Sequence, residues 1–161
     1  MASDSDGRCG EVASDLLIIV VTAVQLIFFT FFYEYIAWPV KAPDGSVTWV
    51  SLLTDEYFNW LPFVIAASII VIVVTIVMMI YNRAWFRQSG WILFSLLGIT
   101  MTTSLLIIFP FDFSVGPNDA VAELAPTVVT VALLFMAAFY AVSAAVQLKD
   151  LRKISARNDA P

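Results

Sequence analysis

The chain has 161 residues, of which 61% are hydrophobic and only 13% are charged. Soluble domains usually have roughly 45–50% apolar and about 25% charged residues, so this composition excludes a soluble globular domain and favours an integral membrane protein. The net charge of −5 disfavours nucleic-acid binding. Histidine is absent and Cys9 is the single cysteine, so we expect no metal, no cofactor and no internal disulfide.

Four apolar segments are long enough to cross a bilayer, which requires about 20 mostly apolar residues per helix. Backbone polar groups in lipid must be satisfied within the segment, so each segment is expected to be a helix. The sequence therefore predicts an all-α, polytopic integral membrane protein with a four-transmembrane-helix bundle. The expected spans are about 16–38, 62–81, 91–109 and 127–148, with tails at 1–15 and 149–161.

Residues that commonly begin or end helices mark the boundaries of these spans. The signals are Ser14 or Asp15 as the cap of the first span, Pro39 after it, Pro62 in the first turn of the second, Ser89 and Gly90 before the third, Pro110 after it, and Pro126 at the start of the fourth.

Basic residues predict the orientation, because they concentrate in cytoplasmic loops. Arg83 and Arg87 lie between the second and third spans, whereas the first and third loops together hold only Lys41. The C-terminal tail adds Lys149, Arg152, Lys153 and Arg157. We therefore expect both termini in the cytoplasm, and which membrane holds the protein stays open.

The first outer loop, residues 39–61, is the longest segment outside the predicted spans. It can form a short strand pair or an amphipathic helix lying in the headgroups, and its Leu52, Leu53 and Phe58 favour the interfacial helix. Its aromatic residues are the expected contact surface of this loop: Trp49, Tyr57, Phe58 and Trp60.

Glu34 is the one ionisable residue inside the predicted spans, and an intramembrane acid is a functional-site hypothesis by default. It would serve as the proton or cation site of a small transporter. It lies about one helical turn from the end of its span, however, and a relay needs several titratable groups. A carboxylate that reaches the headgroup region is therefore the favoured interpretation.

Uncharged polar residues in the first and third spans allow either packing or a polar path. Thr22 and Gln25 share one helix face, and Thr30 lies on the stripe of Glu34. In the third span the corresponding residues are Ser95, Gly98 and Thr102. Small hydroxyl residues usually let helices approach closely and hydrogen-bond to their own carbonyls, so packing is favoured.

The fourth span carries Ala137, Ala141 and Ala145 at four-residue spacing. Small residues at this spacing let two helices approach closely. We expect a helix contact along this stripe, either within the bundle or with another subunit.

The spans do not bring together the titratable groups that catalysis normally needs, so we expect a protein that is not an enzyme. The predicted function is that of an accessory, assembly or stabilising subunit of a larger membrane complex. Its partners would be membrane lipid and other membrane subunits or further copies of itself. The alternative is a small homo-oligomeric transporter or channel that uses Glu34. A weaker alternative is a lipid- or quinone-binding protein that uses the aromatic block at residues 28–35.

Overall fold

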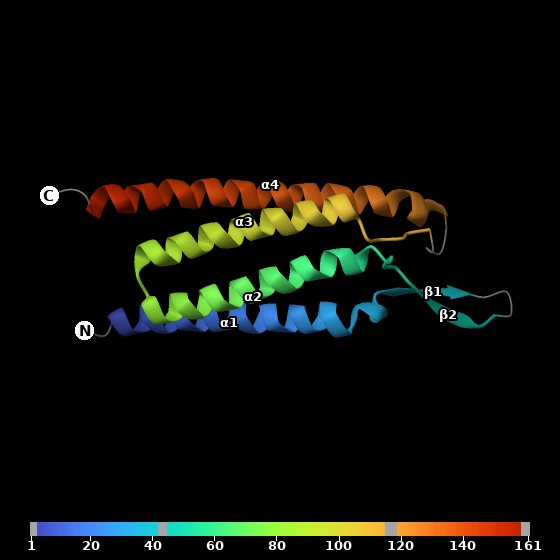
Figure 1. Ribbon diagram of the computed structural model, residues 1–161, viewed down its shortest axis with the longest axis horizontal. Coiled ribbons are helices and arrows are strands. Elements are labelled where there is room, and N and C mark those ends of the chain that lie inside the picture. Colours follow the sequence, from blue (N-terminus) through green and yellow to red (C-terminus); the bar gives the residue numbers. More distant parts are fainter. Residues whose placement is uncertain (1–2, 42–44, 115–118, 159–161) are drawn as a thin grey trace.

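The computed structural model describes residues 3–41, 45–114 and 119–158, and it is built from four long helices (Figure 1). They are α1 (Ser3–Phe31), α2 (Tyr57–Tyr81), α3 (Ala84–Ile108) and α4 (Asp119–Asn158). Each contains a stretch that is long and apolar enough to cross a membrane. The predicted fold class is confirmed: the protein is an all-α, multi-pass membrane protein with four membrane-spanning helices.

The helices pack in chain order, so that α2 and α3 lie between α1 and α4 (Figure 1). The most extensive contact is between α3 and α4, and no extensive contact joins α1 to α4 among the described residues. Both termini lie at one end of the bundle, here called the terminal end. A β-hairpin lies at the opposite end, here called the hairpin end. The bundle is therefore open along the side between its first and last helices.

The first helix is displaced toward the N-terminus relative to its predicted span. It ends at Phe31, and a 3-10 turn, η1 (Tyr33–Tyr35), follows it. Glu34 therefore lies beyond the helix and not inside it. The prediction that Ser14 or Asp15 caps this helix is wrong, because α1 begins at Ser3 and both residues are interior.

The second and third helices are joined by only two residues. The prediction that Ser89 and Gly90 break the chain is wrong, since α3 already begins at Ala84. Gly90 is buried, and a Cβ atom there would collide with the thioether of Met78 in α2. Gly90 therefore allows α2 and α3 to pack closely, and it does not reverse the chain. The reversal occurs at Asn82, whose positive φ of 23° is better tolerated by asparagine than by most residues.

The fourth helix is the longest, with 40 residues. At 1.5 Å per residue it measures about 60 Å, roughly twice the thickness of a bilayer's hydrocarbon core. Because it begins at Asp119, Pro126 lies inside the helix and does not open it.

The chain between α1 and α2 forms an antiparallel hairpin of β1 (Ala37–Lys41) and β2 (Val47–Ser51). The favoured prediction of an interfacial helix is wrong, and the alternative of a strand pair is correct. Valine, threonine and tryptophan in β2 prefer extended backbone. Gly45 adopts a φ of +83° just before this strand, a value that glycine adopts without steric cost.

Backbone hydrogen bonds close the base of the hairpin and attach it to the chain after α3. The amide of Leu52 donates to the carbonyl of Ile36, and the amide of Asp112 donates to the carbonyl of Leu52. An isolated bridge also pairs Leu53 with Phe111. These bonds connect the segment between α1 and α2 with the segment between α3 and α4.

The buried core also lies near this end and is formed by Tyr57, Trp60 and Val64 of α2. Half-buried side chains pack around it from the other elements: Phe29, Tyr33, Leu53, Leu61, Met101, Leu105 and Ile108. Tyr57 and Trp60 were expected as an outer contact surface, but their burial leaves only Trp49 and Phe58 of that set exposed.

Candidate functional site

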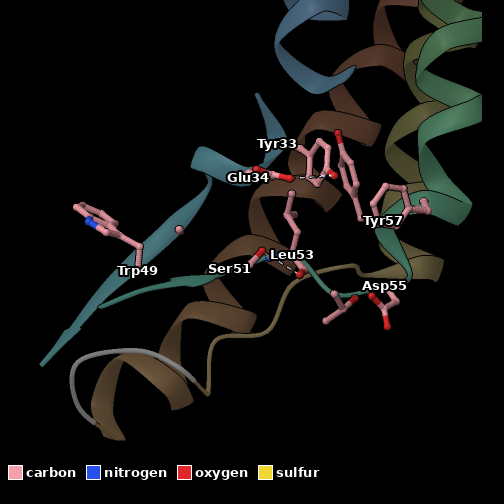
Figure 2. Close-up of a pocket in the computed structure, with 10 residues that line it drawn as sticks. Tyr33, Glu34, Trp49, Ser51, Leu53, Asp55 and Tyr57 are labelled. Atoms are coloured by element: carbon pink, nitrogen blue, oxygen red, sulfur yellow. Dashed lines mark hydrogen bonds between the residues drawn. The ribbon is translucent and has the colours of Figure 1, made fainter. Parts of the chain in front are cut away.

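A pocket of about 350 Å³ lies at the hairpin end and is the first candidate site. Its walls come from η1, the hairpin, and the segment that leads into α2. Figure 2 shows Tyr33 and Glu34 beside the ring of Tyr57, with Asp55 below them and Trp49 standing apart on its strand. The pocket thus combines an aromatic wall with two carboxylates.

Aromatic packing fixes the shape of this pocket. The rings of Tyr33 and Tyr57 are stacked with centroids 5.5 Å apart, and Phe58 meets Tyr33 edge to face at 5.4 Å. The Tyr57 hydroxyl donates a hydrogen bond to the carbonyl of Phe29 in α1. These contacts hold η1 against α2, which explains why the apolar chain after Phe31 leaves the helix.

Glu34 and Asp55 give the pocket an acidic character. Both residues are exposed, and the Tyr33 hydroxyl lies 3.5 Å from Oε1 of Glu34. Glu34 also lines an adjoining hollow of about 500 Å³ together with Tyr35, Ala37 and Trp49. No third His, Cys, Asp or Glu joins them to form a metal-binding group within the described ranges. Such a surface attracts a cationic group and repels an anion.

Thr54 contributes a polar atom without a partner to the same pocket. Its Oγ1 is buried and makes no hydrogen bond in the part of the chain that the structure describes. A buried hydroxyl without a partner is unfavourable, so this atom is suited to bind a group that enters the pocket.

A second cavity, of about 410 Å³, lies between the helices. It brings together Thr22, Gln25, Gly98 and Thr102, four of the polar or small residues that the sequence singles out. Thr30 is half-buried in α1 and lines neither cavity.

Other polar residues of the third span serve helix packing. The Ser95 hydroxyl lies 3.3 Å from the Ser143 hydroxyl and 3.3 Å from Oε1 of Gln147, which links α3 to α4. The Thr102 hydroxyl donates to the carbonyl of Gly98 at 2.7 Å. The α4 partners could not be predicted from the sequence, because single polar residues in an apolar helix give no pairing signal.

Two of the three alanines of the α4 stripe are exposed. Ala137 is half-buried, whereas Ala141 and Ala145 are exposed. The α3 helix approaches α4 closely at Tyr140: the ring of Tyr140 lies against Gly98, where a Cβ would be 2.7 Å from Cδ1 of the tyrosine. The exposed alanines are therefore available to a neighbouring helix.

A buried ion pair that the sequence does not predict joins Asp15 of α1 to Arg87 of α3. Nη1 and Nη2 of Arg87 donate to the two carboxylate oxygens of Asp15, at 2.8 and 3.2 Å. The Asp15 side chain is fully buried and that of Arg87 is 17% exposed. Extending the first helix upstream of residue 16 would have placed Asp15 inside it, but nothing in the sequence pairs it with Arg87.

Comparison of the chain with protein-family models, with curated proteins and with solved structures finds no match.

Proposed function

We propose that the protein is a non-catalytic accessory subunit of a larger membrane complex, which it contacts through the surface around its hairpin. The observation that carries this proposal is the exposure of the hairpin. All five residues of β2 are exposed, and the Trp49 side chain is 69% exposed. An isolated two-stranded hairpin is marginally stable, and tryptophan is enriched at protein interfaces.

Two further features support a protein partner at this position. Each strand pairs only with the other in the described sheet, so the outer edges of β1 and β2 are open to a further strand. Trp49 also borders the acidic pocket that contains Glu34 and Asp55. A partner segment that presents an arginine or lysine beside an extended strand would complement both features.

Alanine variants of two exposed tryptophans test this proposal. Trp49 is on the hairpin, and Trp85 is 47% exposed near the start of α3 at the opposite end. Loss of a tryptophan anchor typically weakens an interface by about 2 kcal/mol or more, roughly 30-fold. Trp49→Ala should release the partner subunits on purification in mild detergent, and Trp85→Ala should retain them. Equal retention by both variants would contradict the proposal.

The proposed orientation places both termini in the cytoplasm and the hairpin on the opposite side. Its support is the distribution of Arg and Lys in the loops and tail. Trp49→Cys in a Cys9→Ser background should react with a membrane-impermeant maleimide added to sealed vesicles of the native membrane whose non-cytoplasmic face is outward. The natural Cys9 should react only after the membrane is opened, and the reverse pattern would overturn this orientation.

A second candidate function is a homo-oligomeric transporter or channel for cations. The observation that favours it is the position of Glu34 between two adjoining hollows, with Asp55 in one of them. Glu34→Gln should then abolish cation flux into proteoliposomes at unchanged protein content. Unaltered flux, or no flux in the wild type, would exclude this function.

A further inference from the structure

The cavity between the helices lies near the middle of the predicted membrane spans. It is lined by side chains from all four helices, among them Gln25 of α1, Ser68 of α2, Phe94 of α3 and Tyr140 of α4. None of the described residues that line it is Asp, Glu, Lys or Arg. Its volume of about 410 Å³ falls within the size range of small-molecule sites, which are mostly apolar with a few polar groups.

The cavity is bordered by exposed side chains on the side between α1 and α4. The helices α1 and α4, which border it, share no extensive contact in the described chain. Gln25 of α1 and Met136 of α4 line the cavity and are both exposed. A molecule dissolved in the bilayer can therefore enter between these two helices without leaving the hydrocarbon core.

Of the polar side chains that line the cavity, those of Thr22, Gln25, Ser68 and Tyr140 make no hydrogen bond among the described residues. Other hydroxyls of the same helices, such as those of Thr75 and Thr102, donate to the carbonyl four residues earlier, each at 2.7 Å. Ser68 is only 6% exposed, yet its hydroxyl makes no such bond among the described residues, and neither does the amide of Gln25. An unsatisfied polar group in a lipid-like environment is costly, so both groups are suited to bind a ligand.

We propose that this cavity binds an uncharged, lipid-soluble molecule of the quinone class, whose carbonyl oxygens accept hydrogen bonds from Gln25 and Ser68. A charged head is disfavoured because the lining has no counter-charge and the site lies deep in the spans. The rings of Phe29, Trp60 and Phe94 also line the cavity and provide flat apolar surface for a planar head. The apolar tail of the ligand would leave between α1 and α4. This site is independent of the contacts proposed for the hairpin.

The test is equilibrium binding of a radiolabelled short-chain benzoquinone to the full chain in lipid nanodiscs, with empty nanodiscs as the measure of partitioning. Ser68→Ala and Gln25→Leu each remove one hydrogen-bonding group. Ala67→Phe places a ring in the cavity, because Ala67 is part of its lining. The matched control is Ser89→Ala, which removes a hydroxyl that bonds to the Trp85 carbonyl outside the cavity.

The wild type and Ser89→Ala should bind the quinone saturably, with one site per chain. Ser68→Ala and Gln25→Leu should each weaken binding about two- to tenfold, the loss expected for one neutral hydrogen bond. Ala67→Phe should abolish saturable binding; if that variant does not fold, the two smaller substitutions still decide the outcome. Uptake that never saturates, or equal affinity in Ser68→Ala, Gln25→Leu and Ser89→Ala, would overturn the proposal. So would saturable binding by charged phospholipid alone.

Trp49→Ala separates this proposal from the proposed function. That variant should lose partner subunits and still bind the quinone as tightly as the wild type. A parallel loss of both properties would show that the cavity is not an independent site.

Discussion

The ion pair between Asp15 and Arg87 should respond unequally to the loss of either partner. Arg87→Met leaves the Asp15 carboxylate, which is fully buried, without its counter-charge. Removing one partner of a buried pair typically costs about 3–5 kcal/mol of the free energy of unfolding. Asp15→Leu leaves an arginine that is already 17% exposed and has a long stem that can reach the headgroups. We therefore expect Asp15→Leu to lower the free energy of unfolding by about 1–3 kcal/mol.

The double variant Asp15→Leu, Arg87→Met tests the physical reason directly. Apolar replacement of both buried charges is often neutral or stabilising, so the double variant should be more stable than Arg87→Met alone. The assay is reversible unfolding in bicelles, followed by circular dichroism, for the wild type and the three variants.

The exposed pair of Asp150 and Lys153 is the internal control. Its atoms are 3.0 Å apart, but the side chains are 48% and 68% exposed. Such surface pairs contribute roughly 0–1 kcal/mol, so Lys153→Met should change stability little. Two results would refute this reasoning. One is that Arg87→Met lowers the free energy of unfolding no more than Lys153→Met does. The other is that the loss in the double variant equals the sum of the losses in the two single variants.

Three further predictions follow from single contacts. Gly90→Ala forces a Cβ into a buried methionine of α2, and overpacking should lower the free energy of unfolding by about 1–3 kcal/mol; normal stability would contradict this close approach. Tyr57→Phe removes the hydroxyl bound to the Phe29 carbonyl and should cost about 1 kcal/mol in the same assay, whereas no loss would show that the bond is dispensable. Hydrogen bonds from the side chain and backbone of Ser114 lower the pKa of Asp112, so Ser114→Ala should raise that pKa toward its ordinary value in an NMR titration. Because the pKa of Asp112 is lowered in the folded protein, its contribution to stability is present above the ordinary aspartate pKa and is lost as the pH falls through the lowered value. The backbone amide of residue 114 still donates in this variant, so an unchanged titration would exclude the Ser114 hydroxyl as a cause.

The number and kind of helices follow from the sequence because the length of an apolar run is a direct requirement of the bilayer. The ends of the helices do not follow in the same way. The run through Trp38 is apolar enough to continue as a helix, yet the chain turns after Phe31 because Tyr33 stacks on Tyr57. That contact joins residues far apart in the sequence, so no local pattern reports it.

The same distinction applies to the candidate sites: the sequence identifies unusual residues, but it does not show which of them meet in the folded protein. Thr22, Gln25, Gly98 and Thr102 could be singled out as polar or small residues in apolar spans, but their meeting in one cavity depends on how the helices cross. Ser68 gave no signal, because a single serine in a β-branched apolar run resembles a packing residue. The sequence predicts a helix cap at Asp15 and a loop at Arg87, because hydropathy does not report how far a helix continues beyond the membrane.

The mass of the native particle tests the accessory role most directly. The tagged wild-type protein would be purified from its own membrane in mild detergent and measured by native mass spectrometry. The proposed function predicts a particle in which this chain is joined to other subunits in fixed stoichiometry. A bare monomer, or a particle that contains only copies of this chain, would contradict it.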